Sequence, residues 1–293
     1  MALRSEFPRT VARTSALALA VAAVAAVAGP AAAQTFPDDA GWSPLACGNR
    51  PMFDPVGDDA SSPGPRDLVG DDNRPAGFRA VDDDFLYLRL RVDETPGDDT
   101  GLQPFAWGFE LDVNNSDDSY EVLLVAGGDT DEVSVFRNMT TTLADTPRDP
   151  PDLPRIAGHP LSSHGRVVMA AGTGIGAGPD FFLDMAVPWA DVMDFNVTPA
   201  TEVVMWAGSS STVNGLDGDI ACHDGSGGGA PSLHDSGSDR TTIDPDGGGN
   251  PPPPPPGGAR LEGGGGCAAA GGGEGLAMLL VVAAGLGSRR RRA

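Results

Sequence analysis

The chain has 293 residues, enough for one sizeable domain with appended segments or for two small domains. Hydrophobic residues make up 40% of it, which permits a core, but 41 glycines and 27 prolines indicate that much of the length lies outside packed structure. The formal net charge is −22. A field of this sign repels nucleic acid and anionic membrane surfaces and favours bound cations, so nucleic acid is excluded as a partner.

Residues 1–33 predict a secretory signal peptide. Three arginines precede an apolar run over residues 16–28, and small residues follow it. The run is well below the roughly 20 residues that span a bilayer, which disfavours a retained anchor. We therefore expect export, with cleavage between Ala33 and Gln34.

A central all-β domain is predicted over residues 34–225. From Phe85 to Val92 the sequence alternates with a period of two, and residues 105–111 repeat the pattern. Turns rich in Asp, Gly, Asn and Ser separate such segments, as in hairpins or Greek-key connections. Further strands are expected at 120–125, 133–137, 166–171, 181–187 and 202–208. Seven to nine short strands with irregular spacers indicate a two-sheet β-sandwich.

The segments before and between these strands also carry predictions. Residues 34–74 are rich in turn-forming residues and predict an irregular lead-in with one or two short strands. Residues 140–164 hold five prolines and little periodicity, which predicts a long surface loop. Pro188 ends a strand, and residues 189–194 predict a short helical turn.

Two appended segments follow the domain. Residues 226–262 contain glycine runs and a block of six prolines, a composition that predicts a disordered linker. Residues 263–293 contain Cys267, a short apolar stretch over 276–286 and four terminal arginines. This stretch is marginal for a permanent transmembrane helix, but an arginine cluster after it would stay cytoplasmic.

The tail resembles the myxobacterial C-terminal sorting signal MYXO-CTERM, which has the same order of Gly-Cys motif, short apolar helix and arginine-rich end. The resemblance implies transient anchoring in the inner membrane, cleavage near Cys267 and display on the surface of a myxobacterium-like Gram-negative cell. Export and sorting machinery would then be partners, and the membrane would be contacted only through the tail. The alternative is a simple membrane anchor.

Cysteine usage adds one constraint on the domain. Cys47 and Cys222 bracket it, and export would place them in an oxidising space. We expect a disulfide between them that ties the two ends of the domain together. The alternative is two unpaired thiols on terminal loops.

The acidic loop of residues 112–118 is the candidate metal site. Oxygen-bearing side chains stand at alternate positions, namely Asp112, Asn114, Ser116 and Asp118. Such oxygens can converge on one calcium ion if the loop wraps, because calcium takes six to eight oxygen ligands. The alternative is that these residues only form a turn between two strands of a very acidic protein.

Tryptophans provide the candidate for ligand binding. Trp107 shares a face with Phe105, Phe109 and Leu111 and is expected in the core. Trp189 follows the proline that ends a strand, so it could lie at a rim and stack on a sugar ring. Trp206 lies on the minority face of its strand.

Catalytic residues are not identified. The sequence holds no Gly-x-Ser-x-Gly elbow and no Cys/His arrangement of a nucleophile. The four histidines, His159, His164, His223 and His234, lie in expected loops or the linker without metal-ligand spacing. The chain is therefore predicted not to be an enzyme.

Three pieces in order, residues 80–92, 107–114 and 182–189, resemble the family 9 carbohydrate-binding modules and the related DOMON-like sandwiches. They match an Asp turn followed by a strand, a strand ending in an acidic loop, and a strand closed by Pro and an aromatic residue. The resemblance implies a β-sandwich and glycan binding with structural calcium, although the family's pair of stacking aromatics has no match here. We expect a non-catalytic, surface-displayed protein that binds extracellular carbohydrate. The alternative is a structural or adhesive protein with a protein partner and no sugar binding.

Overall fold

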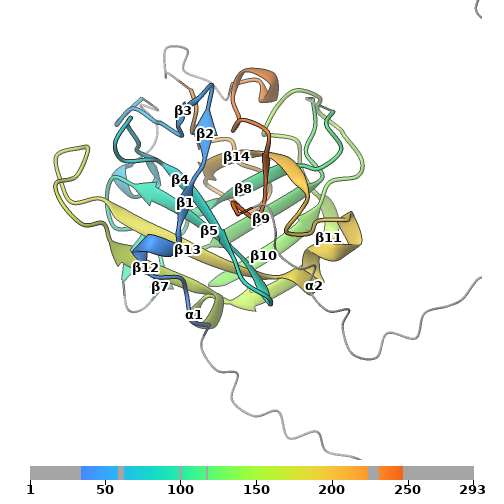
Figure 1. Cartoon of the computed structure of the whole chain (residues 1–293), viewed down its shortest axis with the longest axis horizontal. Coiled ribbons are helices and arrows are strands. Elements are labelled where there is room, and N and C mark those ends of the chain that lie inside the picture. Colours follow the sequence, from blue (N-terminus) through green and yellow to red (C-terminus); the bar gives the residue numbers. More distant parts are fainter. Residues whose placement is uncertain (1–33, 59–62, 99–100, 117, 224–230, 247–293) are drawn as a thin grey trace, which may run out of the picture. The chain divides into compact units, whose positions relative to one another are not determined.

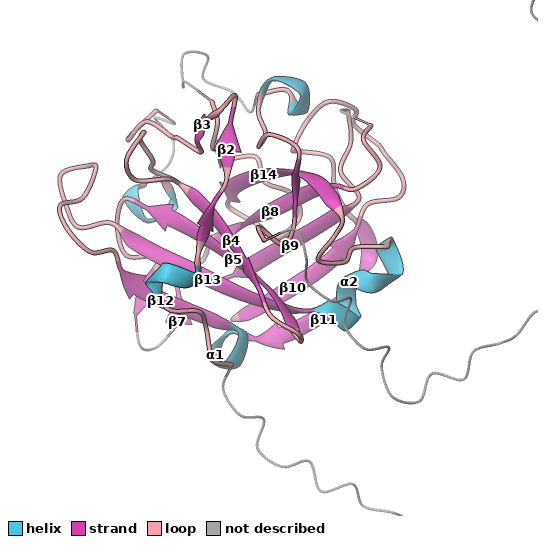
Figure 2. Cartoon of the chain, viewed as in Figure 1, coloured by secondary structure: helices cyan, strands magenta, loops and turns pink. Residues whose placement is uncertain are grey.

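The domain is a sandwich of two antiparallel β-sheets (Figures 1 and 2). The computed structural model describes residues 34–58, 63–98, 101–116, 118–223 and 231–246. Within these residues the chain is mostly strand, with helices of three or four residues each. The all-β sandwich predicted from the alternating segments is confirmed. The predicted C-terminal apolar helix and the proline block lie outside the described residues.

The first sheet has five strands in the order β1-β4-β5-β13-β12. Its central strand β5 pairs with β13 so that Arg89 lies opposite Asp184. The strands are β1 (Ser43–Pro44), β4 (Gly77–Val81), β5 (Phe85–Val92), β12 (Gly165–Met169) and β13 (Phe181–Pro188).

The second sheet has seven strands in the order β11-β10-β9-β8-β14-β15, and β16 also pairs with β14. The strands are β8 (Ala106–Asp112), β9 (Val122–Gly127), β10 (Glu132–Arg137), β11 (Asp152–Pro160), β14 (Glu202–Ser210), β15 (Asp219–Ile220) and β16 (Thr241–Thr242). Two small ribbons lie outside the sheets, β2 (Ala46–Cys47) with β3 (Arg50–Pro51) and β6 (Gly97–Asp98) with β7 (Gly101–Leu102).

The main core lies between the two sheets. The period-two alternation places Leu86, Leu88 and Leu90 of β5 there, all with 0% of their surface exposed. From the second sheet, Trp107 and Phe109 of β8 enter the same core. Burial of whole aliphatic and aromatic side chains is the main source of stability for such a sandwich.

The outer face of the five-stranded sheet is also buried, which alternation alone did not predict. Arg89 is only 2% exposed, and its guanidinium forms two bonds to the carboxylate of Asp184, of 2.6 and 3.0 Å. The same guanidinium lies 4.2 Å from the ring centroid of Trp42 and 4.3 Å from that of Phe182. Pairing and stacking together allow a cation on this face to be covered by the N-terminal segment.

The outer face of the seven-stranded sheet carries its own apolar cluster, which includes Tyr120, Leu123 and Trp206. Leu233, only 2% exposed, packs into it from a segment that the sequence assigned to the disordered linker. Residues 231–246 therefore belong to the domain, and the predicted linker start at residue 226 is wrong. The prediction used the average composition of the segment, which is polar and rich in glycine, and so gave no weight to its two buried apolar residues, Leu233 and Ile243.

The expected long loop over residues 140–164 is also wrong in part. It contains the nine-residue strand β11 and the helical turn α1 (Leu161–His164). Strand β11 lies at the sheet edge and its residues are mostly exposed, so they carry no alternation of polar and apolar side chains. The lead-in has three short strands, β1 to β3, against the one or two expected.

The remaining helices are short. A helical turn after Pro188 was predicted and is present as α2 (Trp189–Val192) followed by η3 (Met193–Phe195). The others are η1 (Asp39–Gly41), η2 (Gly64–Arg66) and η4 (Leu233–Asp235). Among the described residues, none of the helices has the length and apolar character needed to cross a membrane.

Candidate functional site

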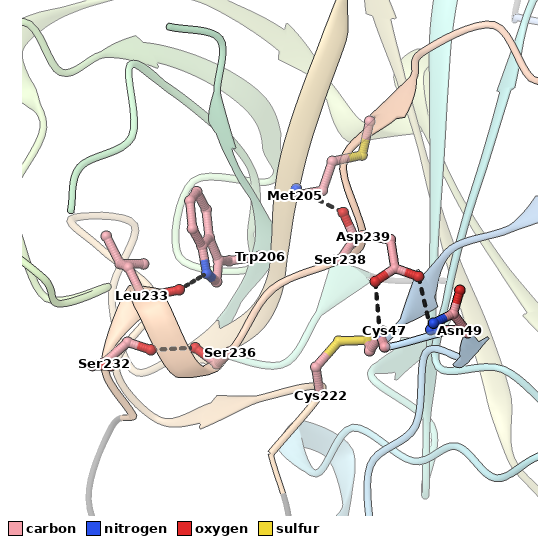
Figure 3. The surroundings of a disulfide bond; sticks show 11 residues. Cys47, Asn49, Met205, Trp206, Cys222, Ser232, Leu233, Ser236, Ser238 and Asp239 are labelled. Atoms are coloured by element: carbon pink, nitrogen blue, oxygen red, sulfur yellow. Dashed lines mark hydrogen bonds between the residues drawn. A yellow bond between two sulfur atoms is a disulfide. The ribbon is translucent and has the colours of Figure 1, made fainter. Parts of the chain in front are cut away.

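A disulfide joins Cys47 of β2 to Cys222, which follows β15 (Figure 3). The two cysteines are 175 residues apart in sequence, and their Cα atoms are 5.9 Å apart. The backbone N–H of Cys222 also donates to the carbonyl of Phe53 at 2.8 Å. The start of the domain and its last part are thus held together by a covalent bond and a hydrogen bond.

The segment 231–246 reinforces this junction (Figure 3). The carboxylate of Asp239 accepts hydrogen bonds from the backbone N–H groups of Gly48 at 2.7 Å and Asn49 at 2.9 Å. Ser238 bonds to the backbone N–H of Met205 at 2.9 Å, and the indole of Trp206 donates to the carbonyl of Leu233 at 2.9 Å. These bonds fix the segment to both β2 and β14.

The loop of residues 112–118, predicted to bind a metal ion, is held together by hydrogen bonds to Asp112. Asp112, at the end of β8 and fully buried, accepts backbone N–H bonds from Asn114 at 2.9 Å and Asn115 at 2.6 Å. Its other oxygen accepts from the guanidinium of Arg240 at 2.7 Å. Asx-type bonds of this kind stabilise a turn by themselves. Both oxygens of Asp112 are thereby used without any ion.

The other proposed ligands do not converge with Asp112. The side chain of Asn114 donates to Glu121, and the hydroxyl of Ser116 lies 2.6 Å from that of Ser119. Asp118 is exposed. Glu121 also accepts from the N–H of Val113 at 2.9 Å, and burial raises the pKa of this carboxyl. The loop is closed by its own hydrogen bonds, which favours the interpretation as a turn.

A cleft of about 570 Å³ opens beside this loop. Its walls come from the end of β8, from β10 and β11, and from the turn after η3. The residues lining it are Val113, Asn114, Glu121, Arg137, Met139, Ile156, Asp194, Phe195, Asn196 and Thr201. The turn is fixed by Thr201, whose hydroxyl donates to the carbonyl of Asn196 at 2.9 Å, and Asn196 adopts a left-handed φ of 60°. Polar groups from three separate segments thus surround one recess.

A second cleft, of about 580 Å³, lies near the edge strand β12. Asp131, Arg166, Met169 and Phe181 are among its lining residues. It contains no residue that the sequence singled out.

The structure overturns Trp189 as a ligand-stacking residue. Its side chain is 2% exposed and its indole donates to the carbonyl of Asp82 at 2.9 Å. All four tryptophans of the chain lie in its described part, and none is more than 7% exposed. Trp107 and Trp206 are likewise buried, each donating to a backbone carbonyl. The tryptophans are therefore structural, because a sugar ring needs an open indole face.

One group that sequence spacing did not reveal is a pair of histidines. The rings of His159 and His164 stack with centroids 4.4 Å apart, and His159 Nε2 lies 2.6 Å from Asp191 Oδ2. Burial, and then the neighbouring His159, lowers the pKa of His164. The pair meets because β11 and α1 turn back on each other. Since β11 was assigned to a loop, nothing in the sequence indicated the contact.

The processing residues are only partly within the described part. Ala33 and Cys267 lie outside it, while Gln34 is described and donates its backbone N–H to the carbonyl of Ser163 at 3.2 Å.

No protein-family model matches this chain, and searches of the curated proteins and of the solved structures found no match. The candidate site is therefore argued from its own geometry.

Proposed function

We propose that this protein is a non-catalytic, exported protein that is displayed on the cell surface and binds a neutral extracellular polysaccharide in the cleft beside loop 112–118. The observation that carries the proposal is the composition of that cleft. It combines exposed hydrogen-bonding side chains with exposed apolar ones in a recess of about 570 Å³.

The chemistry of the lining suits a sugar. Arg137, Asn114 and Asn196 are exposed and offer donors and acceptors for hydroxyl groups. Met139 and Phe195 offer apolar surface for the C–H face of a pyranose ring. Recesses that bind small polar ligands typically pair apolar lining with a few convergent polar groups.

The charge of the protein restricts the class of polysaccharide. Between residues 34 and 262 there are 12 arginines against 39 acidic residues. The field of so acidic a chain repels anionic polymers at low ionic strength. A neutral polysaccharide meets no such repulsion, and seven of the ten residues that line the cleft are uncharged, the exceptions being Glu121, Arg137 and Asp194.

A protein partner is the second candidate, and a specific observation favours it. The exposed large apolar side chains of the described residues gather partly around this cleft: Met139 is 65% exposed and Ile156 41%. Leu153, on the same strand as Ile156, is 73% exposed. Grouped exposed apolar residues mark interaction surfaces.

The test measures binding of the full chain to a panel of neutral and anionic polysaccharides, by affinity electrophoresis or by calorimetry. We expect saturable binding to a neutral member, and about a thirtyfold loss of affinity for Met139→Ala combined with Arg137→Ala, since two lost contacts of about 1 kcal/mol each give this factor. Both residues are exposed, so the fold should persist.

The matched control is Met169→Ala combined with Arg148→Ala. Met169 is 61% exposed and lies at the second cleft, and Arg148 is exposed away from both clefts. This double variant should bind like the parent. Absence of binding to every polysaccharide, together with loss of cell–cell cohesion in the Met139/Arg137 variant, would replace the proposal by the protein-partner alternative.

A further inference from the structure

Three carboxylates from distant parts of the sequence converge at another place in the domain. Asp54, Asp58 and Asp219 each present an oxygen within 4.8 Å of the others. Asp54 is 0% and Asp219 4% exposed, while Asp58 is half-buried. Like charges this close, out of water, repel strongly unless a cation or a proton compensates them.

Asp54 is the residue that points to a ligand. Within the described residues, neither of its carboxylate oxygens accepts a hydrogen bond from an N–H group or a hydroxyl, although the side chain is completely buried and its polar neighbour is the carboxyl of Asp219. By contrast, Asp219 accepts the backbone N–H of Leu68 at 2.6 Å. A buried carboxylate without donors is costly, and buried charges in proteins are normally paired or coordinate a metal.

The electrostatic surroundings of Asp54 are acidic. Burial raises its pKa most, followed by the charges of Asp219, Asp58 and Asp67. Arg66 also lies nearby, with its guanidinium over the ring of Phe105 and close to Gly218. Burial and acidic neighbours therefore dominate the shift in the pKa of Asp54.

The backbone holds Asp54 and Asp219 in place. Asp54 forms an antiparallel bridge with Gly70, with hydrogen bonds of 3.0 and 2.8 Å in the two directions. A Cβ atom at Gly70 would lie 2.6 Å from the backbone nitrogen of Ala76, so the close approach requires glycine. Asp219 belongs to β15, three residues before the disulfide-bonded Cys222. Two of the three carboxylates are therefore preorganised, Asp54 by a β-bridge and Asp219 by a strand next to the disulfide.

We infer that Asp54, Asp58 and Asp219 form a binding site for one calcium ion, a site distinct from loop 112–118. Carboxylate oxygens are the ligands that hard cations prefer, and calcium accepts the irregular geometry and additional water ligands that three carboxylates leave room for. Magnesium is less suited because it demands near-ideal octahedral geometry.

The site is separate from the proposed ligand cleft and does not rest on it. Asp219 pairs with Ser209, which in turn lies opposite Trp107 near the start of β8. The cleft begins at Val113, just beyond the end of the same strand. Six residue steps along the extended chain, about 20 Å, separate Trp107 from Val113. Binding at one site can therefore be tested without disturbing the other.

The experiment is calcium titration of the full chain after treatment with EDTA, by calorimetry and by thermal unfolding. We expect one calcium ion per chain at this site, and a rise in Tm of about 5–10 °C at a hundredfold excess of free calcium over Kd. Asp54→Asn should raise Kd at least tenfold. In EDTA the same variant should unfold at or above the Tm of the parent, because it relieves repulsion, whereas in calcium it should unfold below it.

The change in Tm caused by Asp54→Asn should thus differ in sign between EDTA and calcium. This distinguishes loss of a calcium ligand from a damaged fold, which would lower Tm in both. Glu110→Gln is the matched control, since Glu110 is also a fully buried carboxyl but, among the described residues, belongs to no group of carboxylates that could hold a metal ion. It should leave the Kd for calcium unchanged. Equal Tm in calcium and EDTA, with no heat of binding, would overturn the inference and leave Asp54 and Asp219 as a pair that shares a proton. A response to magnesium equal to that to calcium would overturn the assignment of the ion.

Discussion

At the scale of single residues, Glu110 shows how a buried acid links stability to pH. It is fully buried on β8; one oxygen lies 3.4 Å from the backbone nitrogen of Leu216, and the other has no hydrogen-bond partner in the part of the chain that the structure describes. Burial first, and then the charges of Asp149 and Asp217, raise its pKa well above the ordinary value of 4.5. The native state therefore keeps a proton that the unfolded chain releases above pH 4.5.

The consequence is a loss of stability as pH rises from about 4.5 through the higher pKa of the folded state, by at most about 1.4 kcal/mol per pH unit. We expect Glu110→Gln, which mimics the protonated form, to match the parent near pH 4 and to be at least about 1 kcal/mol more stable at pH 8. Denaturant unfolding at both pH values measures this.

Glu202→Gln serves as the control, because Glu202 is an exposed glutamate on β14. It should leave the pH dependence of the parent unchanged. A parallel pH profile for the parent and for Glu110→Gln would contradict the role given to Glu110.

Sequence reasoning at this scale succeeded where a residue shared a face with others. Trp107 was assigned to the core because Phe109 and Leu111 lie on the same face, and all three are buried. Trp189 was misassigned because a position after a proline does not reveal whether the chain then turns inward. Asp54 was missed because its carboxylate neighbours come from positions up to 165 residues away, which only the fold brings together.

At the scale of elements, period-two alternation predicted the central strands and their faces. Strands β5, β8, β13 and β14 all lie within two residues of their predicted ends. The edge strand β11 was not predicted, since an exposed edge has no need to alternate. The burial of Arg89 on the outer face of the five-stranded sheet was not predicted either, because it depends on the N-terminal segment that carries Trp42.

The disulfide is the cross-link between elements with the largest expected effect on stability. It closes a loop of 175 residues, for which chain entropy in the unfolded state corresponds to about 5 kcal/mol. We expect the Cys47→Ser, Cys222→Ser double variant to lose stability of this order, seen as a lower guanidinium midpoint, and reduction of the parent to have the same effect.

Cys267→Ser is the matched control, because Cys267 lies outside the described residues and outside this loop. Its midpoint should equal that of the parent. If reduction leaves the midpoint of the parent unchanged, the bond does not contribute in solution.

At the scale of the whole molecule, the domain has three apolar layers: a core between the sheets and a smaller cluster on the outer face of each. The sequence predicted only the first. The two outer clusters are completed by Phe36 and Leu233, from segments that precede and follow the regular strands. Compositional averages treat such segments as irregular, although a few well-placed apolar residues fix each to the domain.

The destination of the protein is a further whole-molecule prediction, and it rests on the ends of the sequence. We expect protein recovered from the cell surface to begin at Gln34 and to lack the residues after the region of Cys267. Mass spectrometry of protein released by surface proteolysis measures both ends. Cys267→Ala should keep the tail and leave the protein in the inner membrane.

The paired control is removal of residues 263–293, which should send the domain to the medium. Surface-exposed protein with an intact C-terminus would contradict cleavage and favour a permanent anchor.

The edge strand of the seven-stranded sheet affects how neighbouring copies of the protein can associate. Strand β11 pairs with β10 along one side only, and its chain contains Pro154 and Pro160, which have no N–H group to donate. A free strand edge ordinarily templates the addition of another chain, and missing donors interrupt that template. Arg155, between the prolines and ion-paired with Glu132, adds a charge to the same edge. Neighbouring copies packed side by side should therefore stay separate molecules, without joining their sheets into a continuous fibril.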